Sequence, residues 1–93
     1  MQFAGTPNFM APELFQKRQY DEKVDIFAFG TLIWELVWRE VPLDGYEPAE
    51  IKAKVESGET LKANYGIDQR ITQLINDCRS LSPADRPAFK EII

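Results

Sequence analysis

The sequence predicts an all-α fold of four or five helices around one central hydrophobic helix. Three observations favour it. Apolar residues recur three and four positions apart in several segments, and no segment shows the strict alternation of a strand. The third is that Asp, Ser or Pro stands at the start of most candidate helices, as helix starts prefer. A length of 93 residues, with 44% hydrophobic and 28% charged side chains, suits one globular domain.

The first segment predicts a loop that leads into a single helical turn. Residues 1–10 have no helical period, and Gly5 and Pro7 are typical of a loop. Residues 11–15 then predict one helical turn, because proline is tolerated near the start of a helix. The polar residues 16–20 are expected to connect this turn to the next helix.

A long helix is predicted from about residue 22 to residue 38. Asp21 is a suitable N-cap, because its carboxylate can accept from free backbone N–H groups of the first turn. The apolar residues cover almost every face: Val24, Ile26, Phe27, Ala28, Phe29, Leu32, Ile33, Trp34, Leu36, Val37 and Trp38. Since a helix that is apolar all round packs in an interior, we expect this helix to be buried on all sides, with Leu32 and Leu36 in the core.

The next helix is predicted to be short and amphipathic. Pro48 suits its start, and Gly58 is placed to end it. Ile51 and Val55 form one weak apolar stripe, so most of this helix is expected to be exposed.

Two more helical segments are predicted after a polar connection. Asp68 is the N-cap candidate of a helix whose apolar residues follow the one-sided spacing i, i+3, i+4 and i+7: Ile71, Leu74, Ile75 and Cys78. Ser82 and Pro83 restart the chain as a cap and a first helical residue, and Pro87 interrupts it. Residues 89–93 are expected to begin a last helix.

The composition excludes several kinds of site. The net charge is −4, with a pI near 4.8 and no basic run, so no nucleic-acid partner is expected. The absence of His excludes a Ser-His-Asp triad, a Cys-His pair and a His-ligated metal. Cys78 is the only cysteine, so no intrachain disulfide can form; we expect it to be a small buried hydrophobe in a reducing, cytoplasmic protein.

Association with a membrane is not expected either. No apolar run follows a basic N-terminal start, so the sequence carries no sign of a secretory signal. The longest apolar-rich window, residues 24–38, has eleven apolar positions out of fifteen. It contains Asp25, Gly30 and Glu35 and falls short of the roughly 18 apolar residues that a membrane span needs.

Four ordered motifs resemble those of protein kinases. GTPNFMAPE at residues 5–13 resembles the end of an activation segment with its Ala-Pro-Glu motif, and DIFAFG at residues 25–30 resembles the Asp-x-x-x-x-Gly helix of the family. VPL at residues 41–43 resembles the segment after that helix, and DRPAF at residues 85–89 resembles the terminal Arg-Pro signature. The resemblance implies that residues 1–93 form a single partial domain, from the end of the activation segment to the start of the last helix of the helical C-lobe.

The resemblance implies structural roles for three charged residues. Glu13 and Arg86 would form a buried ion pair, for which the forked guanidinium is well suited; the alternative is two solvated surface charges. Asp25 would anchor the catalytic loop by accepting its backbone N–H groups; the alternative is an exposed acid on the flank of a helix.

The loop before the Ala-Pro-Glu motif resembles the substrate-docking edge of the tyrosine-kinase-like group, which mostly phosphorylates serine and threonine. Its residues here are Gly5, Thr6, Pro7 and Met10. In one departure from the family, Cys78 is followed by Arg79, where many members have Trp.

The resemblance implies that the parent protein transfers the γ-phosphoryl group of Mg-ATP to serine or threonine of a protein substrate. This chain alone is expected to be catalytically incomplete and to bind neither ATP nor a metal, because it has no G-x-G-x-x-G, H-R-D or D-F-G motif. Two alternatives stay open: the scaffold part of a pseudokinase, and an autonomous helical interaction module. The isolated chain is expected to self-associate, because its central helix would otherwise leave apolar surface exposed. Two copies would pair their central helices or exchange a segment across the loops near Pro42 or Gly58; the competing outcome is a loosely packed monomer.

Overall fold

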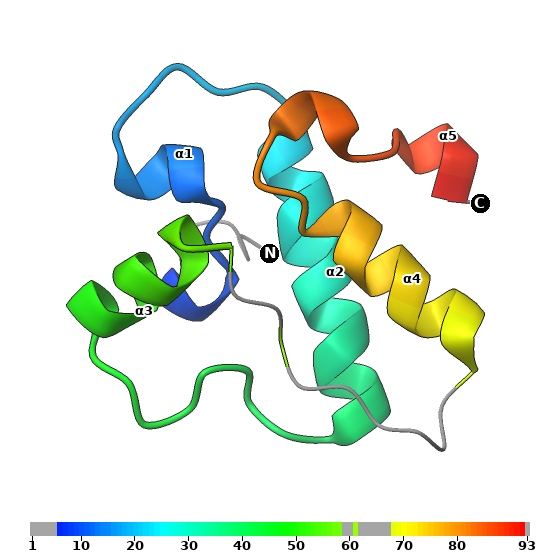
Figure 1. The fold of residues 1–93 in the computed structure, drawn as a ribbon, viewed down its shortest axis with the longest axis horizontal. Coiled ribbons are helices and arrows are strands. Elements are labelled where there is room, and N and C mark those ends of the chain that lie inside the picture. Colours follow the sequence, from blue (N-terminus) through cyan, green and yellow to red (C-terminus); the bar gives the residue numbers. More distant parts are fainter. Residues whose placement is uncertain (1–5, 59–60, 62–67, 93) are drawn as a thin grey trace.

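The computed structural model describes residues 6–58, 61 and 68–92. Within these residues the chain is all-helical, as predicted, with five α-helices, two short 3₁₀ turns and no strand. Figure 1 shows α2 in the middle of the molecule, with α4 along one side and α1 and α3 on the other. The elements in order are η2 (Pro7–Phe9), α1 (Pro12–Phe15), α2 (Lys23–Trp38), α3 (Pro48–Glu56), α4 (Gln69–Cys78), η3 (Pro83–Asp85) and α5 (Phe89–Ile92).

The helix starts follow from local side-chain chemistry. The N-cap of α2 is Glu22 and not Asp21 as predicted, and the side chain of Glu22 makes no capping bond. Asp21 lies one residue earlier, where it accepts from the amide of Lys23 at 2.9 Å and so satisfies a free donor at the start of α2. Before α3, the amide of Glu47 donates to the side chain of Glu50 at 3.0 Å, which is half of a capping box. Asp68 accepts from the amide of Arg70 at 2.8 Å and caps α4, as the sequence predicts.

Gly30 allows α2 and α4 to approach each other closely. A Cβ atom at this position would lie 2.6 Å from the Cβ of Cys78 and 3.2 Å from the carbonyl oxygen of Ile75. Such a separation is far inside van der Waals contact, so only glycine fits without a shift of the backbone. Cys78 is completely buried beneath Gly30, which confirms the prediction that it is a small buried hydrophobe.

A second apolar cluster joins the other face of α2 to α1 and α3. Its buried members are Ala11, Val24, Phe27, Ile51 and Val55, with Leu14, Phe15 and Leu43 packed against them. Because Ile51 and Val55 stand four positions apart on α3, this single stripe is enough to seat that short helix.

The prediction that α2 is buried on all sides is wrong. Its buried residues, apart from Trp34, lie between Val24 and Thr31, where the neighbouring helices pack. Leu36 is 67% exposed, and Leu32 is only partly buried. The physical reason is that the described elements cover this face of the C-terminal half of α2 only in part. None of the helices in the described part of the chain has the length and hydropathy to cross a membrane.

Candidate functional site

The loop before α1 is short, and most of its described residues, 6–10, are partly or fully buried. Thr6 is exposed, and Pro7 opens η2, in which the amide of Phe9 donates to the carbonyl of Thr6 at 2.8 Å. The side chain of Phe9 is buried and anchors the loop in the interior, while Met10 is partly buried. Gly5, which the sequence analysis assigns to the same edge, lies outside the described residues.

Asn8 ties this loop to the connection between α2 and α3. Its side-chain Nδ2 donates to the carbonyl of Pro42 at 2.8 Å and to that of Leu43 at 3.4 Å. Pro42 is itself fully buried, so the acceptors are firmly placed. The sequence predicts a loop over residues 1–10 but not this bond of Asn8, because a bond from a side chain to a backbone carbonyl 34 residues away leaves no local pattern.

Glu13 and Arg86 lie together in a buried, bidentate ion pair. Arg86 Nη1 donates to Glu13 Oε2 at 2.8 Å, and Nη2 donates to Oε1 at 2.9 Å. Only 2% of Arg86 and 6% of Glu13 are exposed to solvent. Charge-assisted bidentate pairs are the strongest of the protein hydrogen bonds, and this one joins α1 to the segment after η3.

Every N–H of the Arg86 guanidinium has an acceptor. Besides the two bonds to Glu13, Nε donates to the carbonyl of Ser80 at 2.8 Å, Nη1 to that of Lys23 at 3.0 Å and Nη2 to that of Leu81 at 3.3 Å. In return, Lys23 Nζ donates to the carbonyl of Arg86 at 2.6 Å. The full set of partners offsets the cost of desolvating the charge, so the network joins α1, α2 and the end of α4 at one point.

Asp25 stands outside this network. It is in the first turn of α2 and is exposed, whereas Val24 and Ile26 on either side of it are buried. No described residue donates a hydrogen bond to its carboxylate, and its exposure agrees with the alternative of a solvated acid on the flank of the helix.

The described residues do not fit a metal site or a reactive thiol. In residues 6–58, 61 and 68–92, no three Cys, Asp or Glu side chains gather in a way that would hold a metal ion. Burial raises the pKa of the Cys78 thiol from 9.0 to about 11, and Asp77 adds to the rise. The thiol is therefore protonated at neutral pH and is a poor nucleophile.

Comparison with known proteins places almost the whole chain in one family. The family model described as protein tyrosine and serine/threonine kinase matches residues 3–93. A probable serine/threonine-protein kinase of Dictyostelium discoideum is 37% identical over 90% of this chain and 7% of its own length. A probable LIM domain-containing serine/threonine-protein kinase of the same organism is 36% identical over 95% of this chain and 14% of its own length. The mitogen-activated protein kinase kinase kinase mlk-1 of Caenorhabditis elegans is 34% identical over 96% of this chain and 8% of its own length. The chain therefore spans a small fraction of the length of these relatives.

Proposed function

The chain belongs to the protein tyrosine and serine/threonine kinase family, and from this premise we propose that the intact kinase phosphorylates serine or threonine in protein substrates. The chain is a partial kinase domain, so the activity belongs to a larger protein that includes it. The observation that carries the proposal is the buried Glu13–Arg86 pair. It fixes the Ala-Pro-Glu turn, and with it the adjoining loop, on the helical scaffold, which is what a surface that positions a substrate peptide needs.

The choice of serine and threonine over tyrosine has two supports. The relatives named above are called serine/threonine-protein kinases or a mitogen-activated protein kinase kinase kinase. In addition, Thr6 follows Gly5, and this Gly-Thr pair resembles serine/threonine kinases rather than tyrosine kinases. The pair with Pro7 and Met10 also supports membership of the tyrosine-kinase-like group.

This chain would contribute two parts of the intact kinase. Gly5, Thr6, Pro7 and Met10 would form the substrate-docking edge, which is consistent with the exposure of Thr6. Asp25 would anchor the catalytic loop, and its exposed carboxylate is consistent with that role. Glu13 and Arg86 would hold the scaffold together and take no part in the chemistry.

The family implies ATP and Mg²⁺ in the intact kinase. The described residues do not fit either group, because they offer no acidic cluster and the sequence has no Gly-rich phosphate loop. We therefore assign the transfer step to parts of the kinase domain other than this chain. Alone, this chain is expected neither to bind Mg-ATP nor to transfer phosphate.

We also propose that the protein acts in the cytoplasm on protein substrates, without nucleic-acid or membrane partners. The acidic net charge of −4 supports the lack of a nucleic-acid partner, and the free, buried Cys78 suits a reducing compartment. The isolated chain is proposed to self-associate through the exposed face of α2 around Leu36.

A phosphotransfer assay on the intact protein tests the proposal. The protein is incubated with radiolabelled Mg-ATP and a mixture of protein substrates, and the phosphorylated residues are identified after acid hydrolysis. Phosphoserine and phosphothreonine are the expected products. Phosphotyrosine alone would contradict the substrate class, and no transfer by a folded intact protein would indicate a pseudokinase scaffold instead.

A further inference from the structure

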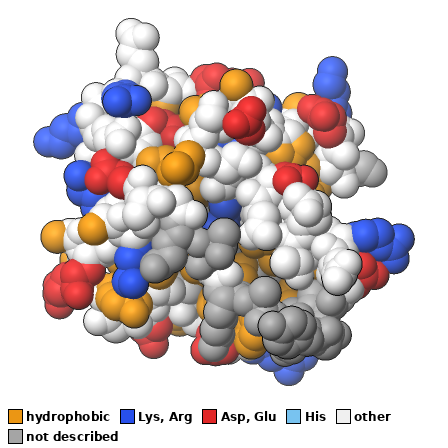
Figure 2. Space-filling view, viewed as in Figure 1, with side chains coloured by type: hydrophobic (Ala, Val, Ile, Leu, Met, Phe, Trp, Pro, Cys, Tyr) orange, Lys and Arg blue, Asp and Glu red, His pale blue; other side chains and the backbone are white. Residues whose placement is uncertain are grey.

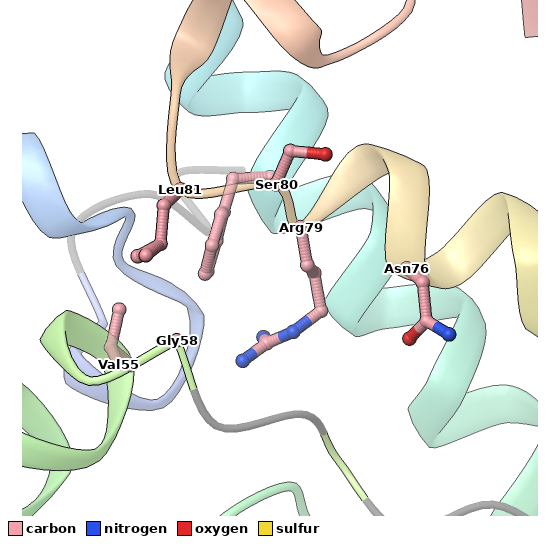
Figure 3. A pocket seen from close by; sticks show the side chains of 7 residues that line it. Val55, Gly58, Asn76, Arg79, Ser80 and Leu81 are labelled. Carbon is pink, nitrogen blue, oxygen red and sulfur yellow. The ribbon is translucent and has the colours of Figure 1, made fainter.

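A pocket lies between the C-terminal ends of α3 and α4, against the side of α2. It has a volume of about 310 Å³, and Phe27, Val55 and Leu81 form its apolar walls. Arg79 enters it from the end of α4, and Figure 3 shows its guanidinium pointing toward the side formed by Val55 and Gly58. In the space-filling view, a basic side chain lies at the bottom of a hollow near the centre of this face (Figure 2).

Neighbouring groups hold the Arg79 side chain in a fixed direction. Nη1 donates to the hydroxyl of Thr31, which is completely buried and in turn donates to the carbonyl of Phe27 at 3.1 Å. The guanidinium carbon lies 4.5 Å from the centre of the Phe27 ring, a cation–π contact. An arginine placed in this way loses little further conformational freedom when it binds a ligand.

The charge of Arg79 has no counter-ion among the described residues. No described carboxylate lies within ion-pair distance of it, whereas Arg86, over the same ring at 5.1 Å, is neutralised by Glu13. Burial, with a contribution from Arg86, lowers the pKa of Arg79 from 12.5 to about 10, so the group is still charged at neutral pH. A desolvated cation is costly unless an anion accompanies it.

Among the described residues, most donors of Arg79 also have no acceptor. A guanidinium carries five N–H groups in a planar fork, and Thr31 is the only described hydrogen-bond acceptor for them. That fork matches the two oxygens of a carboxylate or a phosphate. Arg79 is the residue at which the sequence departs from the kinase pattern, and the proposed phosphotransfer assigns it no role.

We propose that this pocket binds a small organic carboxylate, with the anion on Arg79 and an apolar stem between Phe27, Val55 and Leu81. The three apolar walls favour an organic anion over inorganic phosphate, which would lose its hydration there without an apolar contact in return. The volume is near the lower limit of small-molecule sites and therefore restricts the ligand to a compact one. This inference does not depend on the proposed kinase activity.

Titration of the ¹⁵N-labelled chain by NMR tests the site. The probes are benzoate, its neutral analogue benzyl alcohol, and inorganic phosphate. Benzoate is expected to shift the amides of Gly58, Arg79 and Ser80 saturably and to bind more tightly than either of the other two probes.

Arg79→Met, which keeps the aliphatic stem, is expected to weaken benzoate binding by about tenfold or more, since hydrogen bonds to charged groups are lost. Arg70→Met is the matched control, because Arg70 is on the same helix with its side chain 92% exposed, and its benzoate affinity is expected to be unchanged.

Several outcomes would overturn the proposal. These are the absence of saturable shifts in the wild-type chain, an equal affinity of Arg79→Met for benzoate, and tighter binding of phosphate or benzyl alcohol than of benzoate. Circular dichroism checks that the variants fold. Should Arg79→Met be unfolded, Arg79→Lys decides, because it keeps the charge without the fork: a severalfold loss of affinity supports the site, and an unchanged affinity rejects it.

Discussion

At the residue scale, Arg86 shows how a buried charge is made tolerable. Its five N–H groups meet five acceptors, two on Glu13 and three on backbone carbonyls. These acceptors come from segments far apart in the chain, so Arg86 links α1, the start of α2 and the segment after α4 to one another. Removing the guanidinium would strand the Glu13 carboxylate in an almost dry site, which is far more costly than losing a surface pair.

Arg86→Ala is therefore expected to lower the free energy of unfolding by about 3–5 kcal/mol. The comparison is Arg70→Ala, which removes an arginine paired with Asp68 at the exposed start of α4 and is expected to have only a small effect. Urea unfolding followed by circular dichroism measures both. A loss for Arg86→Ala no larger than that for Arg70→Ala would contradict the structural role of the buried pair.

The buried thiol of Cys78 leads to a prediction about pH. Its pKa is raised to about 11 in the folded chain, whereas the unfolded chain titrates near 9.0. Since the unfolded state loses its proton first as the pH rises, this group should reduce stability progressively between about pH 9 and pH 11 and have no effect at pH 7. As the pH rises across this range, the unfolding free energy of the wild type should fall relative to that of Cys78→Ala, which has no thiol to titrate. A constant difference would argue against a raised pKa.

At the element scale, local chemistry predicts the helices well and their mutual packing poorly. Pro48 and Asp68 stand where helices begin, and Asp21 lies one residue before the N-cap Glu22, because caps and first-turn proline act on adjacent residues. The closeness of α2 and α4 at Gly30 and the bonds of Asn8 depend on residues distant in sequence, so no periodicity indicates them. The resemblance to kinases is what predicts the Glu13–Arg86 pair, because composition alone favours two surface charges.

Gly30→Ala tests the close approach of α2 and α4. Alanine is the better helix former, but its Cβ would collide with that of Cys78 at 2.6 Å. The strain is expected to exceed the gain in propensity, with a net loss of about 1–3 kcal/mol of stability. Repeating Gly30→Ala in a Cys78→Gly background supplies the control, because the colliding atom is gone. Equal effects in the two backgrounds would show that the contact does not limit the packing.

Asn8→Asp tests the tie between the docking loop and the α2–α3 connection. The new carboxylate cannot donate to the carbonyls of Pro42 and Leu43 and would be repelled by them. Hydrogen exchange of the Phe9 and Met10 amides is expected to become faster, while that of the α4 amides is unchanged. Unaltered exchange in residues 9–10 would mean that the buried side chain of Phe9 is sufficient to hold the loop.

At the scale of the whole molecule, the first half of the central helix α2 is buried more completely than its second half. Helices α1, α3 and α4 cover the first half of α2, where residues such as Val24 and Phe27 are buried. On its second half, Leu36 is 67% exposed and Leu32, one turn earlier, is only partly buried, so the described elements leave an incompletely covered apolar stripe there. This stripe is where sequence reasoning about a central helix was wrong, because apolar character indicates what a helix can bury and not which partners are present to bury it.

The isolated chain is expected to self-associate through this stripe. A leucine left in water forgoes about 1.5–3 kcal/mol of burial energy, which a second copy can recover by pairing about a twofold axis. Sedimentation equilibrium over a wide concentration range should show reversible association. Leu36→Lys should weaken it by about tenfold or more, because pairing would bury a charge. Tyr20→Lys is the matched control, since Tyr20 is 64% exposed, close to the 67% of Leu36, but lies outside α2. A strictly monomeric wild-type chain, or equal weakening by the two substitutions, would show that α2 is not the contact surface.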